Sequence, residues 1–387
     1  MERTLGSIVE HLDPSRFEAT ILLRAGGTLL EHYRRFAPTH LYEPPATRAR
    51  VRIARRLGRA GAAKVPRAED LARRQAWARG VVTEFDPHLV VWHHNAAIPA
   101  FEPLADLPVP SVQTIAQHWS GVSRLGDDWL RAIASRSHYV CEGETSVANA
   151  RFLLGVPADR ISVVCIGPDL ADRDRDLARL DRPQRRDLGI PDDAIVVATV
   201  GNLGLSKGTD LWLRAAAELR ARHPDLPLRF LWLGGSPAEW ATFRGEVLRT
   251  VTRDLGLDDV VVFAPQAAKA YPYYDLADIY VQPSRDDAFP GATLEAMSVG
   301  KPVVTFPIGI GAEEYARDAL VRVDALDPSA LAAGISRLVD DPDLRARLGA
   351  AGRTLVEERF DVVQSVRRYE EIFDRVAEQG RRADRSG

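Results

Sequence analysis

Residues 195–209 read IVVATVGNLGLSKGT, and this stretch decides the fold class of the chain. Its first part, Ile195–Val200, is an apolar run interrupted only by Thr199, as expected of a strand buried on both faces of a parallel sheet. A loop with three glycines, residues 201–208, follows and leads into a helical pattern from about Thr209 to Arg222. A buried strand that feeds a helix through a short loop is the building unit of an α/β domain.

The alternation of strand and helix continues to residue 306. It predicts a parallel, doubly wound sheet. Ligands of such sheets bind at the carboxyl ends of the strands, so loops 201–208, 283–291 and 307–314 are where a site is expected. The further strands are predicted at Leu228–Leu233, Val260–Phe263, Asp278–Gln282 and Pro302–Phe306, and the further helices at about Ala238–Leu255, Ala267–Leu276 and Gly291–Val299.

The first half of the chain alternates less regularly. A helical pattern, Glu2–Leu12, precedes its first strand, whereas a doubly wound domain normally begins with a strand and a glycine-rich turn. Either the central strand lies upstream of residue 1 or this fold lacks it, which would leave two strands without a ladder partner. Asp169–Asp187, dense in Asp, Arg and Pro, is interpreted as the connection between two domains. Strands are expected at Ala19–Leu23, Leu89–Trp92, Val109–Ile115, His138–Cys141 and Ile161–Ile166.

Length and composition narrow the class of protein. The 387 residues suggest two domains, and 45% hydrophobic residues suffice for ordinary cores. A net charge of −3 gives no support for general nucleic-acid binding. Two isolated cysteines, Cys141 and Cys165, provide neither a disulfide framework nor a zinc site. No apolar run approaches the roughly 20 residues that span a bilayer, and no signal peptide is visible, so we expect a cytoplasmic protein.

Lysine is rare in this chain, and one lysine ends the glycine-rich loop. The four lysines are Lys64, Lys207, Lys269 and Lys301. At Lys207 the backbone donors of the loop, the dipole of the next helix and a point charge converge, which suits a phosphate group. Neither the GxxxxGK[ST] pattern nor the GxGxxG pattern is matched, which argues against a nicotinamide cofactor.

Two carboxylates flank the start of the helix expected after residue 290, in the stretch PSRDDAFPGATLEAM at 283–297. Asp287 lies in the loop after a strand, and Glu295 falls in the second turn of the helix. Carboxylates near unpaired helical N–H groups suit the recognition of sugar hydroxyls. The alternative is that Asp287 only caps the helix and that Glu295 is a surface residue.

Histidines follow two of the strands expected in the first half. His118 lies just beyond the carboxyl end of the strand at 109–115, where a site is expected, although a structural role is the alternative. His93 and His94 are adjacent, so they point to opposite faces of a strand and do not form a metal pair.

A basic tract runs from Arg48 to Arg79. It contains ten arginines and one lysine, against Glu69 and Asp70. Such a tract suits peripheral contact with an anionic membrane surface or with an acidic acceptor. The alternative is a solvated helical face.

The stretches PSRDDAFPGATLEAMSVGKPVV (283–304) and VGNLGLSKG (200–208) resemble the retaining GT-B glycosyltransferases of family four, also called glycosyl transferases group one. The family pattern is P-S-x-x-E-G-F-G-x-x-x-L-E-A-M-A-x-G-x-P-V-V. The resemblance implies an α/β fold of two doubly wound, Rossmann-like parallel-sheet domains facing a cleft. An acceptor-side domain would span residues 1–172 and a nucleotide-sugar domain residues 173–360. Residues 361–387 would form a helix that packs back on the first domain.

The resemblance also implies roles for single residues. Asp287 would contact the transferred sugar, Glu295 the nucleotide ribose and Lys207 the diphosphate, while His118 would lie beside the reacting sugar. Asn202 stands where many members have a diphosphate-binding Arg, and Asp287 where Glu is commoner. The remaining donor-binding positions implied in this way are Gly201, Asn202, Ala288, Phe289, Pro290, Gly291 and Glu314.

These implied roles predict a retaining, metal-independent glycosyltransferase without a cofactor. It would move a sugar from a nucleotide-diphosphate sugar to a glycan, lipid or small-molecule acceptor. The alternative is a non-catalytic, nucleotide-sugar-binding relic of the fold, which Asn202 and the unusual start favour. A glycoside hydrolase that uses Asp287 and Glu295 ranks last, because its mechanism needs neither Lys207 nor the glycine loop.

Overall fold

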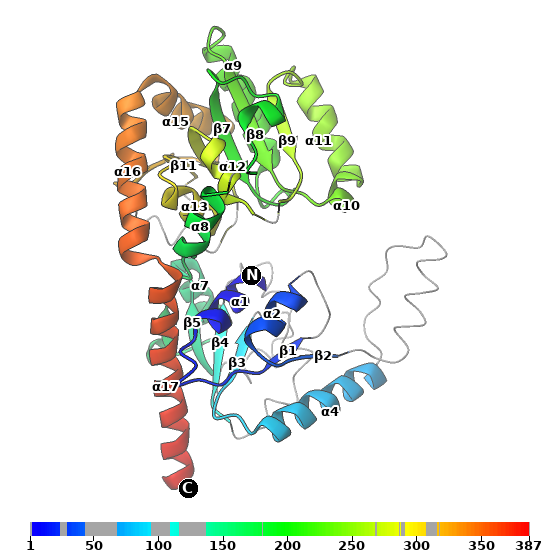
Figure 1. Cartoon of the computed structure of the whole chain (residues 1–387), viewed down its shortest axis with the longest axis vertical. Coiled ribbons are helices and arrows are strands. Elements are labelled where there is room, and N and C mark those ends of the chain that lie inside the picture. The colour runs from blue at the N-terminus through cyan, green and yellow to red at the C-terminus, as the bar shows by residue number, and fades with distance from the viewer. Residues whose placement is uncertain are drawn as a thin grey trace. The chain divides into compact units, whose positions relative to one another are not determined.

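The computed structural model divides the chain into two units. Unit 1 comprises Met1–Cys141, Ser146–Val164 and Val366–Gly387, and unit 2 comprises Glu142–Thr145 and Cys165–Ser365 (Figure 1). The structure describes residues 2–23, 29–42, 68–93, 109–115, 137–179, 181–267, 269–285, 287, 291–306, 316 and 318–386.

The described strands of unit 2 form one sheet of six, in the order β12-β11-β10-β7-β8-β9, and all neighbours are parallel. This order confirms the predicted doubly wound sheet. The chain crosses from β7 to β8 on one side and from β10 to β11 on the other, so the order reverses between β7 and β10. The carboxyl ends of these two neighbours are therefore where a ligand is expected. The strands are β7 (Ile195–Val200), β8 (Leu228–Leu233), β9 (Val261–Ala264), β10 (Ile279–Gln282), β11 (Val303–Thr305) and β12 (Leu320–Arg322).

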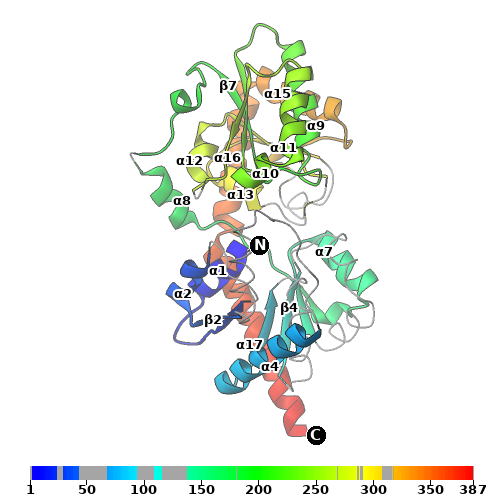
Figure 2. The ribbon, with the colours of Figure 1, turned by 90° about the vertical axis from the view of Figure 1, so that its right-hand side faces the viewer.

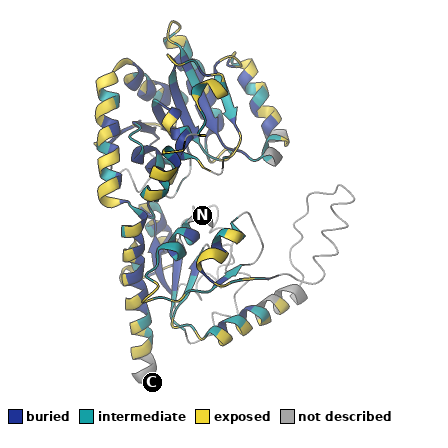
Figure 3. Cartoon of the chain, viewed as in Figure 1, coloured by how far each residue is buried: buried dark blue, intermediate teal, exposed yellow. Residues whose placement is uncertain are grey.

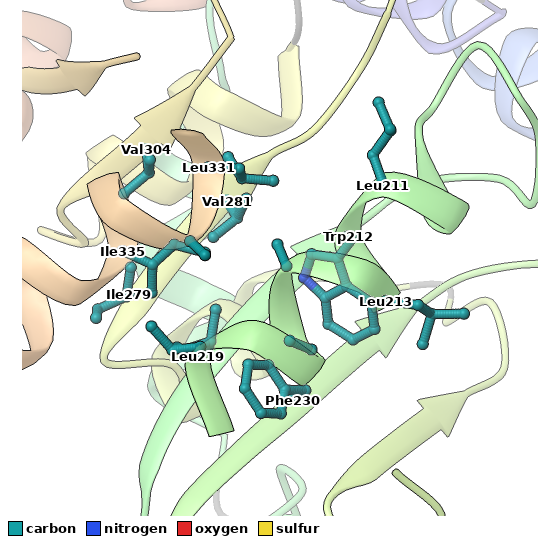
Figure 4. Close-up of a cluster of buried hydrophobic side chains, with 14 of the residues drawn as sticks. Leu211, Trp212, Leu213, Leu219, Phe230, Ile279, Val281, Val304, Leu331 and Ile335 are labelled. Carbon is teal, nitrogen blue, oxygen red and sulfur yellow. The ribbon is translucent and has the colours of Figure 1, made fainter. Parts of the chain in front are cut away.

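Helices cover both faces of this sheet, and the strands between them are buried (Figures 2 and 3). Alternate strand residues point to opposite faces, so Val197 belongs to one buried cluster and Val196 to another. In the first cluster Trp212 packs edge-on against Phe230, with ring centroids 6.0 Å apart (Figure 4). Trp212 also packs edge-on against Trp232, with ring centroids 5.4 Å apart. The helices are α9 (Thr209–Arg222), α10 (Pro237–Trp240), α11 (Phe243–Asp254), α12 (Tyr271–Leu276), α13 (Gly291–Ser298), α15 (Pro328–Asp340) and α16 (Pro342–Arg359).

The segment interpreted as a connection, Asp169–Asp187, is instead part of unit 2, and that interpretation was wrong. It contains helix α8 (Leu170–Leu177), which Asp169 caps by accepting a hydrogen bond from the backbone of Asp172. Arg173 on α8 is buried and donates to the carbonyl of Ser298, 2.8 Å away. Two of the charged side chains that suggested a linker, Asp169 and Arg173, therefore cap and anchor the helix.

The helix predicted at Ala238–Leu255 is also interrupted. The structure has α10 and α11 in its place, and Thr242 between them has an extended backbone. The indole N–H of Trp240, at the end of α10, donates a 3.2 Å hydrogen bond to the carbonyl of Gly234. At Gly245 a Cβ atom would lie 2.3 Å from the carbonyl of Trp240. A glycine is therefore required where the chain turns from one helix into the next.

The described strands of unit 1 form two separate parallel ladders, β1–β2 and β3–β4–β5–β6. Within the part of the unit that the structure describes, β1 and β3 each pair on one edge only. The two explanations of the unusual start, a central strand upstream of residue 1 and a fold that lacks this strand, both stay predictions. The elements are α1 (Glu2–His11), β1 (Ile21–Leu23), α2 (Leu30–Phe36), β2 (Thr39–Leu41), α4 (Ala68–Phe85), β3 (Val90–His93), β4 (Ser111–Ile115), β5 (Ser137–Cys141), α7 (Glu144–Ala148) and β6 (Ile161–Val163).

The last helix, α17 (Val362–Ser386), belongs to unit 1 from Val366 onward. There Arg16 donates to Glu370 at 2.8 Å, and Phe17 lies edge-on to Phe373 with ring centroids 6.3 Å apart. Polar and aromatic contacts thus fasten the C-terminal helix to the segment between α1 and β1.

Replacing Trp212 by alanine should destabilise the chain by about 3–5 kcal/mol, because a fully buried indole leaves a cavity. Urea unfolding measures this difference. Leu205→Ala is the control: its side chain is 72% exposed, so we expect a change of less than about 0.5 kcal/mol. Equal losses in both variants would contradict the assignment of the core.

Candidate functional site

The loops that follow β7 and β10 touch each other. Gly208 has a φ of 70°, and a Cβ atom there would lie 1.9 Å from the carbonyl oxygen of Pro283. The backbone N–H of Arg285 donates to the carbonyl of Ser206 at 2.8 Å. Only glycine permits both the left-handed backbone and this approach, so the sequence SKG closes the gap between the two strands.

An ion pair reinforces this junction. The guanidinium of Arg285 donates to both carboxylate oxygens of Asp210, each at 2.7 Å, and also to the carbonyl of Leu205. Burial alone would raise the pKa of Asp210, but the hydrogen bonds and charge of Arg285 outweigh it, and the net result is a lowered pKa. Asp210 therefore stays ionised, and the first turn of α9 is held against the loop after β10.

Lys207 and Asp287 meet across this junction. The ammonium Nζ of Lys207 lies 2.5 Å from Oδ2 of Asp287, and the two side chains are 32% and 13% exposed. The same oxygen accepts hydrogen bonds from Nε2 of Gln282 and from the hydroxyl of Ser284, each at 3.2 Å. Three donors thus converge on Oδ2, whereas no hydrogen bond to Oδ1 is found within the described part of the chain.

Glu295 lies in the second turn of α13, half-buried, and accepts a 2.7 Å hydrogen bond from the hydroxyl of Tyr274 on α12. Burial first, and then the charge of Glu295, raise the pKa of the Tyr274 hydroxyl well above its ordinary value. Burial likewise raises the pKa of Tyr280, and the charges of both Glu295 and Asp287 contribute. Tyr280 therefore lies within the field of both carboxylates.

The other predicted site residues divide into two groups. Gly201 accepts from the indole N–H of Trp232 at 3.0 Å and donates to Leu233, so its backbone is fixed by the core. Asn202 is exposed in the loop, and Gly291 is exposed at the start of α13. Outside the described residues lie His118, Ala288, Phe289, Pro290, Glu314, His94 and residues 48–67 of the basic tract.

Sequence reasoning missed Glu142, which directly follows β5. It is buried, and its carbonyl accepts a 2.6 Å hydrogen bond from the thiol of Cys165. Burial, with a smaller contribution from the negative charge of Asp287, raises the pKa of Glu142 to about 7. Its position at the carboxyl end of a parallel strand was the available signal.

The described residues contain no group of three or more His, Cys, Asp or Glu side chains arranged to hold a metal ion. Among the helices that the structure describes, none combines the length and the apolar character needed to cross a membrane.

Comparison with known families identifies the part of the chain that carries this site. The model of the family described as glycosyl transferases group 1 matches residues 194–341. This part of the chain is a group 1 glycosyltransferase domain. It contains β7, β10, Lys207, Asp287 and Glu295, so the resemblance found in the sequence motifs is confirmed.

Curated relatives of this chain carry the name D-inositol 3-phosphate glycosyltransferase. The protein from Acidothermus cellulolyticus is 33% identical over 280 residues, which cover 71% of this chain and 57% of the relative. The protein from Thermomonospora curvata is 32% identical over 285 residues, covering 72% and 62%. This chain thus spans little more than half the length of the curated relatives that it matches.

Solved structures confirm the predicted fold class. A glycosyltransferase from Rickettsia africae superposes with a TM-score of 0.76 at 15% identity, covering 97% of this chain and 94% of that one. Anabaena Alr3699/HepE, solved with UDP and glucose, gives 0.74 at 20% identity, with 96% and 95% coverage. Both units have the α/β, parallel-sheet architecture of the GT-B fold.

The raised pKa of Glu142 makes stability depend on pH. A folded-state pKa above the ordinary glutamate value of 4.5 means that the protonated carboxyl favours the fold. This contribution is fully present below pH 4.5 and is lost as the pH rises through about 7. Glu142→Gln, which stays neutral, should therefore resemble the unsubstituted chain at pH 4.5. At pH 8 it should be more stable than that chain by at most about 3 kcal/mol.

Urea unfolding of both proteins at the two pH values measures this difference. A stability difference that is the same at pH 4.5 and pH 8 would contradict the burial of Glu142 in a raised-pKa environment.

Proposed function

We propose that the chain transfers a sugar from a nucleotide-diphosphate sugar to an acceptor hydroxyl, with retention of the anomeric configuration. The observation that carries the proposal is the meeting of Lys207 and Asp287 at the point where the strand order reverses, within a group 1 glycosyltransferase domain. A cation and a carboxylate on adjacent loops match the two halves of such a donor, the diphosphate and the sugar.

The charges of the reaction match the charges of the site. When the bond between the anomeric carbon and the phosphate oxygen breaks, its electron pair leaves with the diphosphate and positive charge develops on the sugar ring. Lys207 and the N-terminus of α9 face the developing negative charge, and such preorganised donors contribute about 2.7–4 kcal/mol each. The cation of Lys207 thereby supplies charge that a metal ion would otherwise supply, and we propose a metal-independent, cofactor-free reaction.

The step that forms the new bond follows from the same arrangement. The acceptor hydroxyl attacks the anomeric carbon on the face from which the diphosphate leaves. Its proton passes to a leaving phosphate oxygen, so the chain needs no nucleophile of its own. Asp287 would accept a hydrogen bond from a hydroxyl of the transferred sugar, and Glu295 would accept hydrogen bonds from hydroxyls of the nucleotide ribose.

Donor and acceptor can be ranked from the relatives. The HepE structure holds UDP and glucose, so UDP-hexoses are the first donors to test. The curated relatives are named for D-inositol 3-phosphate, so inositol phosphates are the first acceptors, before glycans and lipids.

Lys207→Ala and Glu295→Ala should each reduce sugar transfer at least tenfold while the protein stays folded, because each removes one charge aimed at the donor. Transfer of a radiolabelled sugar from the nucleotide donor to acceptor measures this. Lys269→Ala is the matched control, since Lys269 pairs with Asp176 on α8, at 3.3 Å, and not with Asp287.

Near-normal transfer by both site variants would reject the site assignment. Donor binding without any transfer by the unsubstituted protein would favour the non-catalytic alternative.

A further inference from the structure

A chain of buried hydrogen bonds runs along β10 and ends on Asp287. The hydroxyl of Tyr280 donates to Oε1 of Gln282 at 2.8 Å. The amide Nε2 of Gln282 donates to the hydroxyl of Ser284 at 2.7 Å and to Oδ2 of Asp287 at 3.2 Å. The hydroxyl of Ser284 then donates its own proton to the same Oδ2. Tyr280, Gln282 and Ser284 are all buried, so water does not replace these bonds.

The chemistry of the partners fixes which group donates in each hydrogen bond of this series. Oε1 of Gln282 accepts from Tyr280 and, at 3.4 Å, from the hydroxyl of Thr293. The carboxylate of Asp287 can only accept, so the amide must present its N–H groups to it. The reverse orientation of the amide would place an oxygen against the carboxylate. Each side-chain donor proton of Tyr280, Gln282 and Ser284 is therefore used, which is the condition for a stable buried network.

Gln282 and Ser284 share their acceptor with Lys207. All three donate to Oδ2 of Asp287, and among the described residues none donates to Oδ1. Suppose that Lys207 turned to a phosphate and that Gln282 and Ser284 did not donate to Oδ2. The carboxylate of Asp287 would then have no hydrogen-bond donor left among the described residues. The two neutral donors retain the carboxylate when the cation leaves.

We propose that Gln282 is a positioning residue for Asp287. With Ser284 it holds Oδ2 in place, so that Lys207 is released to the diphosphate and Oδ1 is left to accept a hydroxyl of the transferred sugar. This role rests on the proposed function, because it needs a donor with a diphosphate and a sugar. Gln282 does not touch the substrate in this account; it acts through Asp287.

A double-mutant cycle in the transfer reaction tests the role. Gln282→Leu should lower kcat/KM for the nucleotide sugar at least tenfold. In the Asp287→Asn background the same replacement should change kcat/KM less than twofold, because the group that it positions is already altered. Thr199→Val is the matched control. It removes a buried 3.0 Å hydrogen bond from Thr199 to the carbonyl of Val281, which lies next to Gln282 on β10, and transfer should stay within twofold.

A second variant separates positioning from folding. Gln282→Glu keeps the size of the side chain and its bonds to Tyr280 and Thr293, but as a carboxylate it repels Asp287. Once protonated, it donates a hydrogen bond as the amide does. Transfer by this variant, divided by that of the unsubstituted protein at each pH, should therefore rise at least fivefold between pH 8 and pH 5.5.

Additive losses in the cycle, or a flat pH ratio for Gln282→Glu, would overturn the positioning role. Absence of transfer by the unsubstituted protein with any donor would overturn the proposed function and this role with it. Urea unfolding distinguishes the two failures, because it needs no activity. Non-additive midpoint shifts for Gln282→Leu and Asp287→Asn would support the contact, and additive shifts would show that the two side chains are not coupled.

Discussion

The candidate site depends on the approach of two backbone segments, Gly208 and Pro283. A Cβ atom at residue 208 would lie 1.9 Å from the carbonyl of Pro283, so a glycine is the condition for bringing the loops after β7 and β10 into contact. These strands are neighbours in the sheet, and the strand order reverses between them. The two parallel hydrogen bonds of the ion pair between Arg285 and Asp210 then hold the junction. Lys207 and Asp287, 80 residues apart in sequence, meet only because these constraints are satisfied together.

The chemistry of the site follows from how its charges are compensated. In the structure described, Lys207 is neutralised by Asp287, and that carboxylate also holds two neutral donors. A diphosphate offers Lys207 a stronger, doubly charged partner, and the neutral donors allow Asp287 to stay behind. Glu295, which accepts a hydrogen bond from Tyr274, provides a second carboxylate in the second turn of α13. Under the proposed function, Lys207 serves the diphosphate of a sugar donor, and the two carboxylates serve its hydroxyls.

Much of unit 2 could be predicted from the sequence, since its strands are buried on both faces and its loops carry glycine. The predicted bounds of β7, α9 and β8 agree with the structure. The prediction failed where tertiary contacts outweighed composition, as at α8, whose charged residues include the buried Arg173. Gln282 and Glu142 were also missed, because the sequence shows neither the burial of their side chains nor the hydrogen bond from Tyr280 that orients the amide of Gln282. The resemblance of motifs, rather than spacing alone, pointed to Lys207 and Asp287 as donor-binding residues, but their ion pair was not predicted.

The central claim is that the junction of the β7 and β10 loops binds a nucleoside diphosphate through Lys207. The most direct test is thermal unfolding of the unsubstituted chain and of Lys207→Ala with UDP, GDP and ADP. We predict that one of these nucleotides stabilises the unsubstituted chain by about 2.7 kcal/mol at 100 times its Kd. The stabilisation should be largely lost in Lys207→Ala. No shift with any nucleotide in a cooperatively unfolding sample, or an equal shift in the variant, would contradict the claim.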